Sequence, residues 1–333
     1  MREKKIAGKL LGMIIAVCML VGSAGCQIGN TDIVVSNPLT NRQLFRIGGN
    51  ACGLKEARVY LVNYQNIYGT AYTIDLWQHD FGDESLSEFI KAVTLEELTR
   101  VYCMDLLAEA QDTSLTQEEL AQIALAAEEY YDSLTQEEQI YMGVSESDIG
   151  EYYGHYALAQ KLYNALTAGV NDEVSDDEAR VMEIMQIFVT GALDAEEVRR
   201  KLVNGDDFAA VANNYNELSA IQVTVSRDDL PKEVEAIAFQ LDDDAVSDMI
   251  PVENGYYFIK CLNKYNVELT EANKSNIVEK REKEAFDDVY NAFVETLDSN
   301  LNEEVWAELE PETGEGIVTN SFFAVFEKYC GDI

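Results

Sequence analysis

The fold is decided by residues 181–190, which read VMEIMQIFVT. The stretch is apolar and rich in β-branched side chains. Its alternate residues, Met182, Ile184, Gln186 and Phe188, fall on one face of an extended chain. The sequence therefore predicts a buried β-strand here.

The residues that follow predict a small α+β domain. Apolar spacing favours helices at 194–202, 207–213 and 231–240, and β-rich runs favour strands at 223–225, 249–252 and 256–262. Asn254-Gly255, between the last two strands, is a strong signal for a tight hairpin turn. The order is thus strand, helix, helix, strand, helix, strand, strand.

The chain before this domain predicts a helical lobe. Apolar residues recur every three or four positions over 54–68, and Thr94 with Glu97 has the pattern of a capping box. The hexapeptide SLTQEE occurs at 114–119 and again at 133–138, each copy with the pattern of a capping box that opens a helix. We interpret the repeat as two helix starts, because a solenoid would continue it.

Helical periodicity returns after the domain. An apolar stripe over 286–305 predicts one long amphipathic helix, which needs an apolar surface to lie on. The helices before the domain are the obvious surface. The tail 311–333 contains Phe322-Phe323-Ala324-Val325-Phe326, which is too apolar for a free linker and predicts a packed strand or short helix.

The N-terminus predicts export. Residues 1–9 are basic, and residues 10–25 carry no charge, which is shorter than the about 20 residues of a membrane span. Small residues directly before Cys26 resemble a bacterial lipobox, which implies a signal peptide over 1–25, lipidation of Cys26 and a tether over 26–49. The alternative is an ordinary secretory signal with an incidental cysteine.

Composition excludes several function classes. The chain has 61 acidic and 24 basic residues and a formal net charge of −37, and no basic stripe follows the first ten residues, so we expect no nucleic-acid partner. Two histidines cannot build a His-rich metal site, and we expect no metal and no cofactor. The remaining cysteines match no disulfide scaffold, and we expect buried thiols at Cys52, Cys103, Cys261 and Cys330.

The central segment resembles the parvulin family of peptidyl-prolyl isomerases. Both residue type and spacing agree over 181–190, 202–212 (LVNGDDFAAVA), 236–239 (AIAF) and 254–260 (NGYYFIK). The whole layout resembles the PrsA-like and SurA-like exported foldases, in which terminal helices form a chaperone lobe around an inserted parvulin domain. The resemblance implies an α+β protein with an all-helical lobe at 50–174, a four-stranded parvulin-like domain at 175–266, a C-terminal helix at 267–310 that packs on the lobe, and an apolar tail at 311–333.

The chain departs from the parvulin pattern at the site. The two family histidines fall on Gln186 and Tyr257. The proline-binding slot of the family falls on Leu230, Val234 and Phe239, beside Ile184 and Phe188 on the strand. Two interpretations remain open: Gln186 and Tyr257 exchange a hydrogen bond and retain residual activity, or they fill a retired site.

Three hypotheses for function follow. The first is a lipid-anchored folding factor on the outer face of the bacterial cytoplasmic membrane that binds unfolded, newly exported polypeptides. The second is an active peptidyl-prolyl isomerase. The third is a surface lipoprotein with one dedicated partner. Tyrosines of the helical unit either line a client cradle or belong to its core, and His79 and His155 are expected to be incidental groups.

Overall fold

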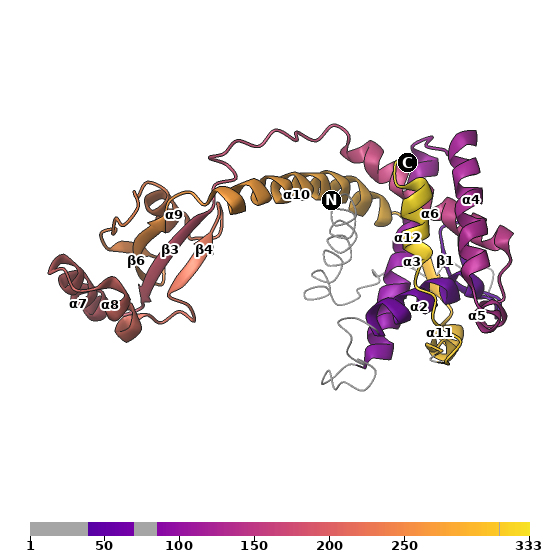
Figure 1. The fold of residues 1–333 in the computed structure, drawn as a ribbon, viewed down its shortest axis with the longest axis horizontal. Coiled ribbons are helices and arrows are strands. Elements are labelled where there is room, and N and C mark those ends of the chain that lie inside the picture. Colours follow the sequence, from indigo (N-terminus) through magenta and orange to yellow (C-terminus); the bar gives the residue numbers. More distant parts are fainter. Residues whose placement is uncertain (1–38, 70–84, 313) are drawn as a thin grey trace. The chain divides into compact units, whose positions relative to one another are not determined.

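The computed structural model describes residues 39–69, 85–312 and 314–333, which form two compact units (Figure 1). One unit, here called the lobe, comprises the described residues up to Tyr163 together with Val289–Ile333; the other, the sheet domain, is Asn164–Asp288. The expected signal peptide, Cys26 and most of the expected tether lie outside the described residues. Within the described ranges, none of the helices is both long and apolar enough to cross a bilayer.

The sheet domain has the strand and helix order that the sequence predicts. Its four antiparallel strands lie in the order β4-β3-β6-β5, with bounds β3 Met182–Val189, β4 Gln222–Val225, β5 Ile250–Val252 and β6 Gly255–Asn263. The helices are α7 Ala192–Val203, α8 Phe208–Tyr215 and α9 Lys232–Ala238. The expected α+β class with a four-stranded domain is therefore confirmed.

The two faces of this sheet bury separate cores, because side chains alternate along each strand. One core contains Ile184, Ile259 and Val234 of α9. The other contains Ile187 and residues of α7 and α8. Helix α9 therefore covers one face, and α7 and α8 cover the other (Figure 1).

The lobe is built mainly of helices. They are α2 Leu54–Gly69, α3 Leu86–Ala110, α4 Gln117–Ser133, α5 Gln136–Met142, α6 Glu146–Thr167, α11 Glu303–Glu308 and α12 Phe322–Cys330. Helix α10, Val267–Val294, begins in the sheet domain and ends in the lobe. Both copies of SLTQEE form the expected capping boxes, at Thr116 for α4 and Thr135 for α5.

The lobe is not all-helical, which corrects our expectation. A three-stranded sheet in the order β2-β1-β7 joins β1 Gln43–Ile47, β2 Asn50–Gly53 and β7 Ser299–Leu301. Part of the expected tether 26–49 is thus a strand. The missed signal is Gly48-Gly49, a two-residue hairpin turn in which Gly48 has a φ of 52°.

The segment 286–305 is not one helix, which is a second correction. Helix α10 ends at Val294, and Phe45 and Ile47 of β1 pair with Leu301 and Ser299 of β7. This pairing supplies hydrogen-bond partners for the backbone groups on the edge of β1. A helix that continued through 299–301 could not supply them. The apolar stripe therefore packs on the lobe through a strand and a new helix.

Thr94 does not start a helix. Helix α3 begins at Leu86 with Ser85 as its N-cap, and the capping box pairs Ser85 with Glu88. Thr94 lies in the middle of α3 and is fully buried. The sequence holds two possible helix starts nine residues apart, and tertiary packing decides between them.

The C-terminal tail forms a helix inside the core of the lobe. Phe322, at the start of α12, is fully buried and contacts the rings of Tyr60, Tyr130 and Tyr153. The hydroxyl of Tyr153 donates a hydrogen bond to the Phe322 carbonyl at 2.8 Å. Tyr60, Tyr130 and Tyr153 therefore belong to the core of the lobe.

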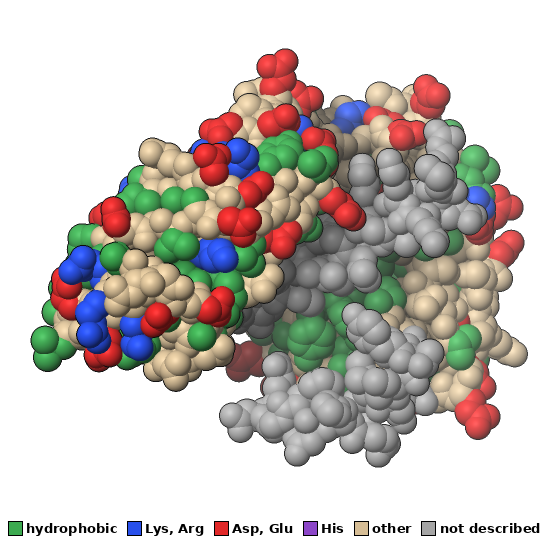
Figure 2. Space-filling model, turned by 60° about the vertical axis from the view of Figure 1, so that its left-hand side comes forward, with side chains coloured by type: hydrophobic (Ala, Val, Ile, Leu, Met, Phe, Trp, Pro, Cys, Tyr) green, Lys and Arg blue, Asp and Glu red, His purple; other side chains and the backbone are tan. Residues whose placement is uncertain are grey.

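The surface carries the acidic excess of the composition. On the visible face, acidic side chains are spread over both units and outnumber the basic ones (Figure 2). An acidic surface of this kind favours solubility, because the molecules repel each other.

The four cysteines of the described chain, Cys52, Cys103, Cys261 and Cys330, are free and buried, as expected.

Candidate functional site

The two positions of the family histidines lie on the same face of the sheet. Gln186 of β3 pairs with Ile259, and Tyr257 of β6 pairs with Phe188. Directly opposed residues of an antiparallel pair share a face, so Gln186 and Tyr257 are diagonal neighbours. The two side chains therefore start from adjacent strands on one face of the sheet.

The side chain of Gln186 is bound to a neighbouring loop. It is 8% exposed, and its Nε2 donates a hydrogen bond to the Ala220 carbonyl at 3.1 Å. Within the described chain, no hydrogen bond joins Gln186 to Tyr257. The amide of Gln186 therefore fixes the loop in this structure.

This loop, residues 216–221, continues the edge of the sheet beyond β4. The Ile221 carbonyl accepts from the Gln186 backbone N–H at 2.7 Å, and the Glu217 N–H donates to the Phe188 carbonyl at 2.9 Å. The side chain of Asn216 accepts from the Phe188 N–H at 3.0 Å and donates to the Leu218 carbonyl at 3.0 Å. Sequence reasoning missed the role of Asn216, because its partners are backbone groups of a distant strand.

The Tyr257 hydroxyl is a polar group of the site that has no hydrogen-bond partner among the described residues. Its ring lies 4.8 Å from that of Phe188, centroid to centroid, and the side chain is only partly buried. Burial raises the pKa of the Tyr257 hydroxyl. The group is therefore a neutral phenol at neutral pH, able to donate one hydrogen bond.

The residues expected to line a proline slot are mostly enclosed. Ile184 and Val234 are fully buried, Phe239 is 6% exposed and Leu230 is partly buried, all in the core between the sheet and α9. Phe188 lies outside this core, against Tyr257. The enclosed side chains leave little apolar surface on which a proline ring can pack.

Two arginines cover the ring of Phe239. The guanidinium carbons of Arg180 and Arg227 lie 4.8 Å and 4.1 Å from the ring centroid. Arg180 also donates to the Phe239 carbonyl at 2.8 Å, and Arg227 pairs with Asp177 at 2.9 Å. Cation–π contacts of this kind stabilise the enclosed ring. A prediction from local sequence could not find them, because Arg180 and Arg227 come from distant segments.

The same face of the sheet also carries a buried thiol. Cys261 is opposite Ile184 on the same face and fully buried. Burial, followed by the nearby charge of Asp243, raises the pKa of the Cys261 thiol. Both histidines of the chain lie outside residues 164–288. No group of three His, Cys, Asp or Glu side chains arranged to hold a metal ion occurs among the described residues.

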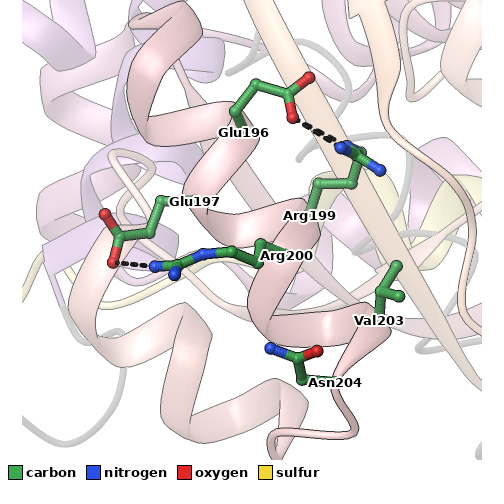
Figure 3. A pocket seen from close by; sticks show the side chains of 6 residues that line it. All are labelled: Glu196, Glu197, Arg199, Arg200, Val203 and Asn204. Atoms are coloured by element: carbon green, nitrogen blue, oxygen red, sulfur yellow. Dashed lines mark hydrogen bonds and ion pairs between the residues drawn. The ribbon is translucent and has the colours of Figure 1, made fainter.

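A surface hollow of about 500 Å³ lies elsewhere, on α7 (Figure 3). It is lined by Val203, Asn204 and two ion pairs within the helix, Arg199 with Glu196 at 2.8 Å and Arg200 with Glu197 at 3.2 Å. Because α7 covers the opposite face of the sheet from Gln186, this hollow is separate from the candidate site. Its charges already neutralise each other.

Comparison with known proteins agrees with this geometry. Residues 159–274 match the family model of the PPIC-type PPIase domain. The chain therefore carries a parvulin domain of the PPIC type.

The relatives are foldases. The chain is 26% identical over 206 residues to the foldase protein PrsA of Caldanaerobacter subterraneus. The aligned residues make up 57% of this chain and 62% of that relative. It is 33% identical over 107 residues to foldase protein PrsA 3 of Bacillus cereus, covering 30% of this chain and 38% of the relative. A crystal structure of PrsA from Bacillus cereus aligns with 74% of this chain and 96% of its own, at 20% identity and a TM-score of 0.39. The chain is thus a parvulin-domain protein related to the PrsA foldases.

Proposed function

We propose that the protein is an extracytoplasmic folding factor that binds unfolded, newly exported polypeptides, and that its parvulin domain binds rather than isomerises them. The relationship to PrsA foldases supports the role in folding. The lipobox-like residues before Cys26 support a lipid anchor on the outer face of the cytoplasmic membrane. The observation that carries the proposal is Gln186, whose amide is bound to Ala220 where the family has an imidazole.

Prolyl isomerisation has a barrier of about 18–20 kcal/mol, which the enzyme lowers by perturbing the amide as it turns. Here the Gln186 amide is occupied and the proline-slot residues are enclosed. The remaining polar group is the Tyr257 hydroxyl. The Tyr257 hydroxyl is one neutral hydrogen-bond donor, and the residues of the proline slot beside it are enclosed. This arrangement favours weak binding of a proline-containing segment over catalysis.

A protease-coupled X-Pro assay on the full chain tests this part. We expect no acceleration over the uncatalysed rate even at high protein concentration. Catalysis by the wild-type chain that is lost in Tyr257→Phe contradicts the proposal and establishes the alternative, an active isomerase. The unpartnered Tyr257 hydroxyl is the observation that favours this alternative. Tyr256→Phe, on the opposite face of the same strand, is the matched control.

Client binding by the lobe has a separate test. Ile140 of α5 and Val318 of the tail are 73% and 60% exposed. The tail segment that carries Val318 packs against α5, because the Val318 N–H donates a hydrogen bond to Glu138 at 2.7 Å. Exposed apolar side chains such as these offer contact surface to unfolded chains.

We expect the full chain to suppress aggregation of several unrelated unfolded proteins, measured by light scattering. The double variant Ile140→Ser, Val318→Ser is expected to suppress aggregation less while unfolding at the same temperature. Leu193→Ser, which changes an 89% exposed leucine of the sheet domain, is the control. One tight partner with no effect on unrelated clients contradicts the proposal and supports a dedicated binding protein.

A further inference from the structure

A group of titratable side chains is enclosed in the lobe where α2, α3 and α6 meet. Glu56, in the first turn of α2, is 1% exposed, and Tyr102 and Asp105 of α3 are 5% and 8% exposed. The side chain of His155, on α6, is 27% exposed. The sequence alone predicts an incidental role for His155, and the candidate site contains none of these residues.

Glu56 connects the three helices. The Tyr102 hydroxyl donates to its Oε2 at 2.6 Å, and the Nδ1 of His155 lies 3.2 Å from its Oε1. The His155 ring also packs edge-on against the Tyr102 ring at 5.2 Å. A buried carboxylate needs such partners, because an unpaired buried charge is strongly unfavourable.

Asp105 is the member without a partner. Its Oδ1 is buried and accepts no hydrogen bond from the described residues. Burial raises the pKa of Asp105 to about 7; the charge of His155 lowers it, and that of Glu56 raises it. Asp105 therefore changes between a neutral acid and a buried anion near neutral pH.

His155 responds to the same charges. Burial opposes its protonation, but the hydrogen bond to Glu56 and the charges of Glu56, Asp105 and Glu151 outweigh burial and raise the pKa of His155 above 6.5. At mildly acidic pH the group holds one anion, Glu56, one cation, His155, and a neutral Asp105. At alkaline pH the imidazole is neutral and the group holds two anions, Glu56 and Asp105. These two carboxylates repel each other at low dielectric.

Among the described residues, the other titratable groups that the electrostatics of this cluster involve are a thiol, phenols and carboxylates, which add no positive charge to it. Cys52 of β2 has a pKa raised by burial and by Glu56, as has Tyr102 of α3. Tyr60 of α2 and Tyr152 of α6 have pKa values raised by burial and then by Glu56. The acids of α6 on this side are Glu151 and Asp148, and Asp148 pairs with Lys55 of α2 at 3.1 Å.

We propose that Glu56, Asp105 and His155 form a proton-controlled latch, which holds α2, α3 and α6 together at mildly acidic pH and loosens the lobe as the pH rises. The proposal does not rest on the proposed function. It concerns the lobe alone.

The sign follows from linkage between protonation and folding. Both pKa values are raised in the folded state, so both groups bind protons more tightly when the lobe is folded. The stability from Asp105 is complete below about 3.9 and is lost as the pH rises to about 7. The stability from His155 is complete below about 6.5 and is lost as the pH rises through its raised pKa.

Thermal unfolding of the full chain between pH 5.5 and 8.5 tests the latch. Trp306 of α11 belongs to the lobe, and the sequence of the sheet domain contains no tryptophan, so tryptophan fluorescence reports unfolding of the lobe. We expect the Tm of the wild type to fall by roughly 5 °C over this range. Asp105→Asn imitates the neutral acid at every pH, so its Tm should fall less with pH than that of the wild type and should exceed it by more at pH 8.5 than at pH 5.5. Glu109→Gln, an exposed acid on the same helix, should retain the wild-type slope.

A second measurement reports on the imidazole directly. In a His79→Gln chain, His155 is the remaining histidine, and its NMR titration should have a midpoint above 6.5 that Asp105→Asn lowers. Equal slopes of Tm against pH in the wild type and Asp105→Asn overturn the proposal. An imidazole midpoint at or below 6.5 in the otherwise wild-type chain overturns it as well, whether or not Asp105→Asn folds.

Discussion

The hexapeptide SLTQEE places the same glutamate in two different environments. Glu119 completes the cap of α4 on the surface and pairs with Lys161 at 2.8 Å. Glu138 completes the same cap on α5 but is fully buried. Its carboxylate also accepts from the N–H groups of Val318 and Thr319 at 2.7 and 2.6 Å and from the Thr319 hydroxyl at 2.6 Å. The cap is a local motif and could be predicted; its second role depends on the tail and could not.

Replacing these two glutamates should therefore have unequal effects. Glu138→Gln removes the charge and replaces one of the two acceptor oxygens with an NH₂ donor, so the buried donors that this oxygen served lose their acceptor, and we expect the lobe to lose about 2–4 kcal/mol of unfolding free energy. Glu119→Gln should cost about 1 kcal/mol or less, typical of an exposed cap. Urea unfolding followed by tryptophan fluorescence measures both. Equal losses would show that the contacts of Glu138 with the tail add no stability.

At the scale of elements, strand β3 shows how a loop can replace a strand. Strand β4 pairs only with Met182–Met185, and residues 216–221 satisfy the rest of that edge. Gln186, at the position of a family histidine, is one of the groups that fix this loop. The loop thus gives Gln186 a structural role, which the strand pattern alone did not reveal.

Asn216→Ala should loosen this edge. The change removes the acceptor of the Phe188 N–H and two donated bonds, to the Leu218 and Ala220 carbonyls, and we expect a loss of about 1–3 kcal/mol. Hydrogen exchange measured by mass spectrometry should show lower protection over 182–190. Asn213→Ala, which removes one exposed bond to the Ala209 carbonyl, is the matched control. Unchanged protection in Asn216→Ala would contradict this account of the loop.

Elements with strong local signals could be predicted, and those that depend on distant partners could not. Short consecutive stretches of sequence carry the signals for strand β3, the Asn254-Gly255 turn and both SLTQEE caps. Strand β7 has three residues and exists because β1 is its partner. The covering of the Phe239 ring likewise depends on Arg180 and Arg227, which lie far apart along the chain.

At the scale of the whole molecule, the lobe is assembled from both ends of the described chain. Phe322 of α12 fills a space between tyrosines of α2, α4 and α6. Asn63 of α2 accepts from the Phe322 N–H at 3.0 Å and donates to the Tyr130 hydroxyl at 2.6 Å. The tail is thus part of the core.

Removing this ring should destabilise the lobe strongly. Phe322→Ala opens a cavity among three tyrosines, and we expect a loss of about 3–5 kcal/mol. Urea unfolding followed by tryptophan fluorescence measures it, and Glu327→Ala, on the exposed side of α12, should change little. A loss below about 1 kcal/mol for Phe322→Ala would show that the tail is an accessory to the core.

The placement of α12 has a consequence for biosynthesis. A ribosome releases the chain from its N-terminus, and domains fold as their residues emerge. The sheet domain is one continuous stretch, Asn164–Asp288, and has all its residues as soon as that stretch is free. Helices α2 to α6 leave earlier but lack Phe322, which follows the sheet domain along the chain. The helices that are made first therefore complete their core only after the sheet domain has been made.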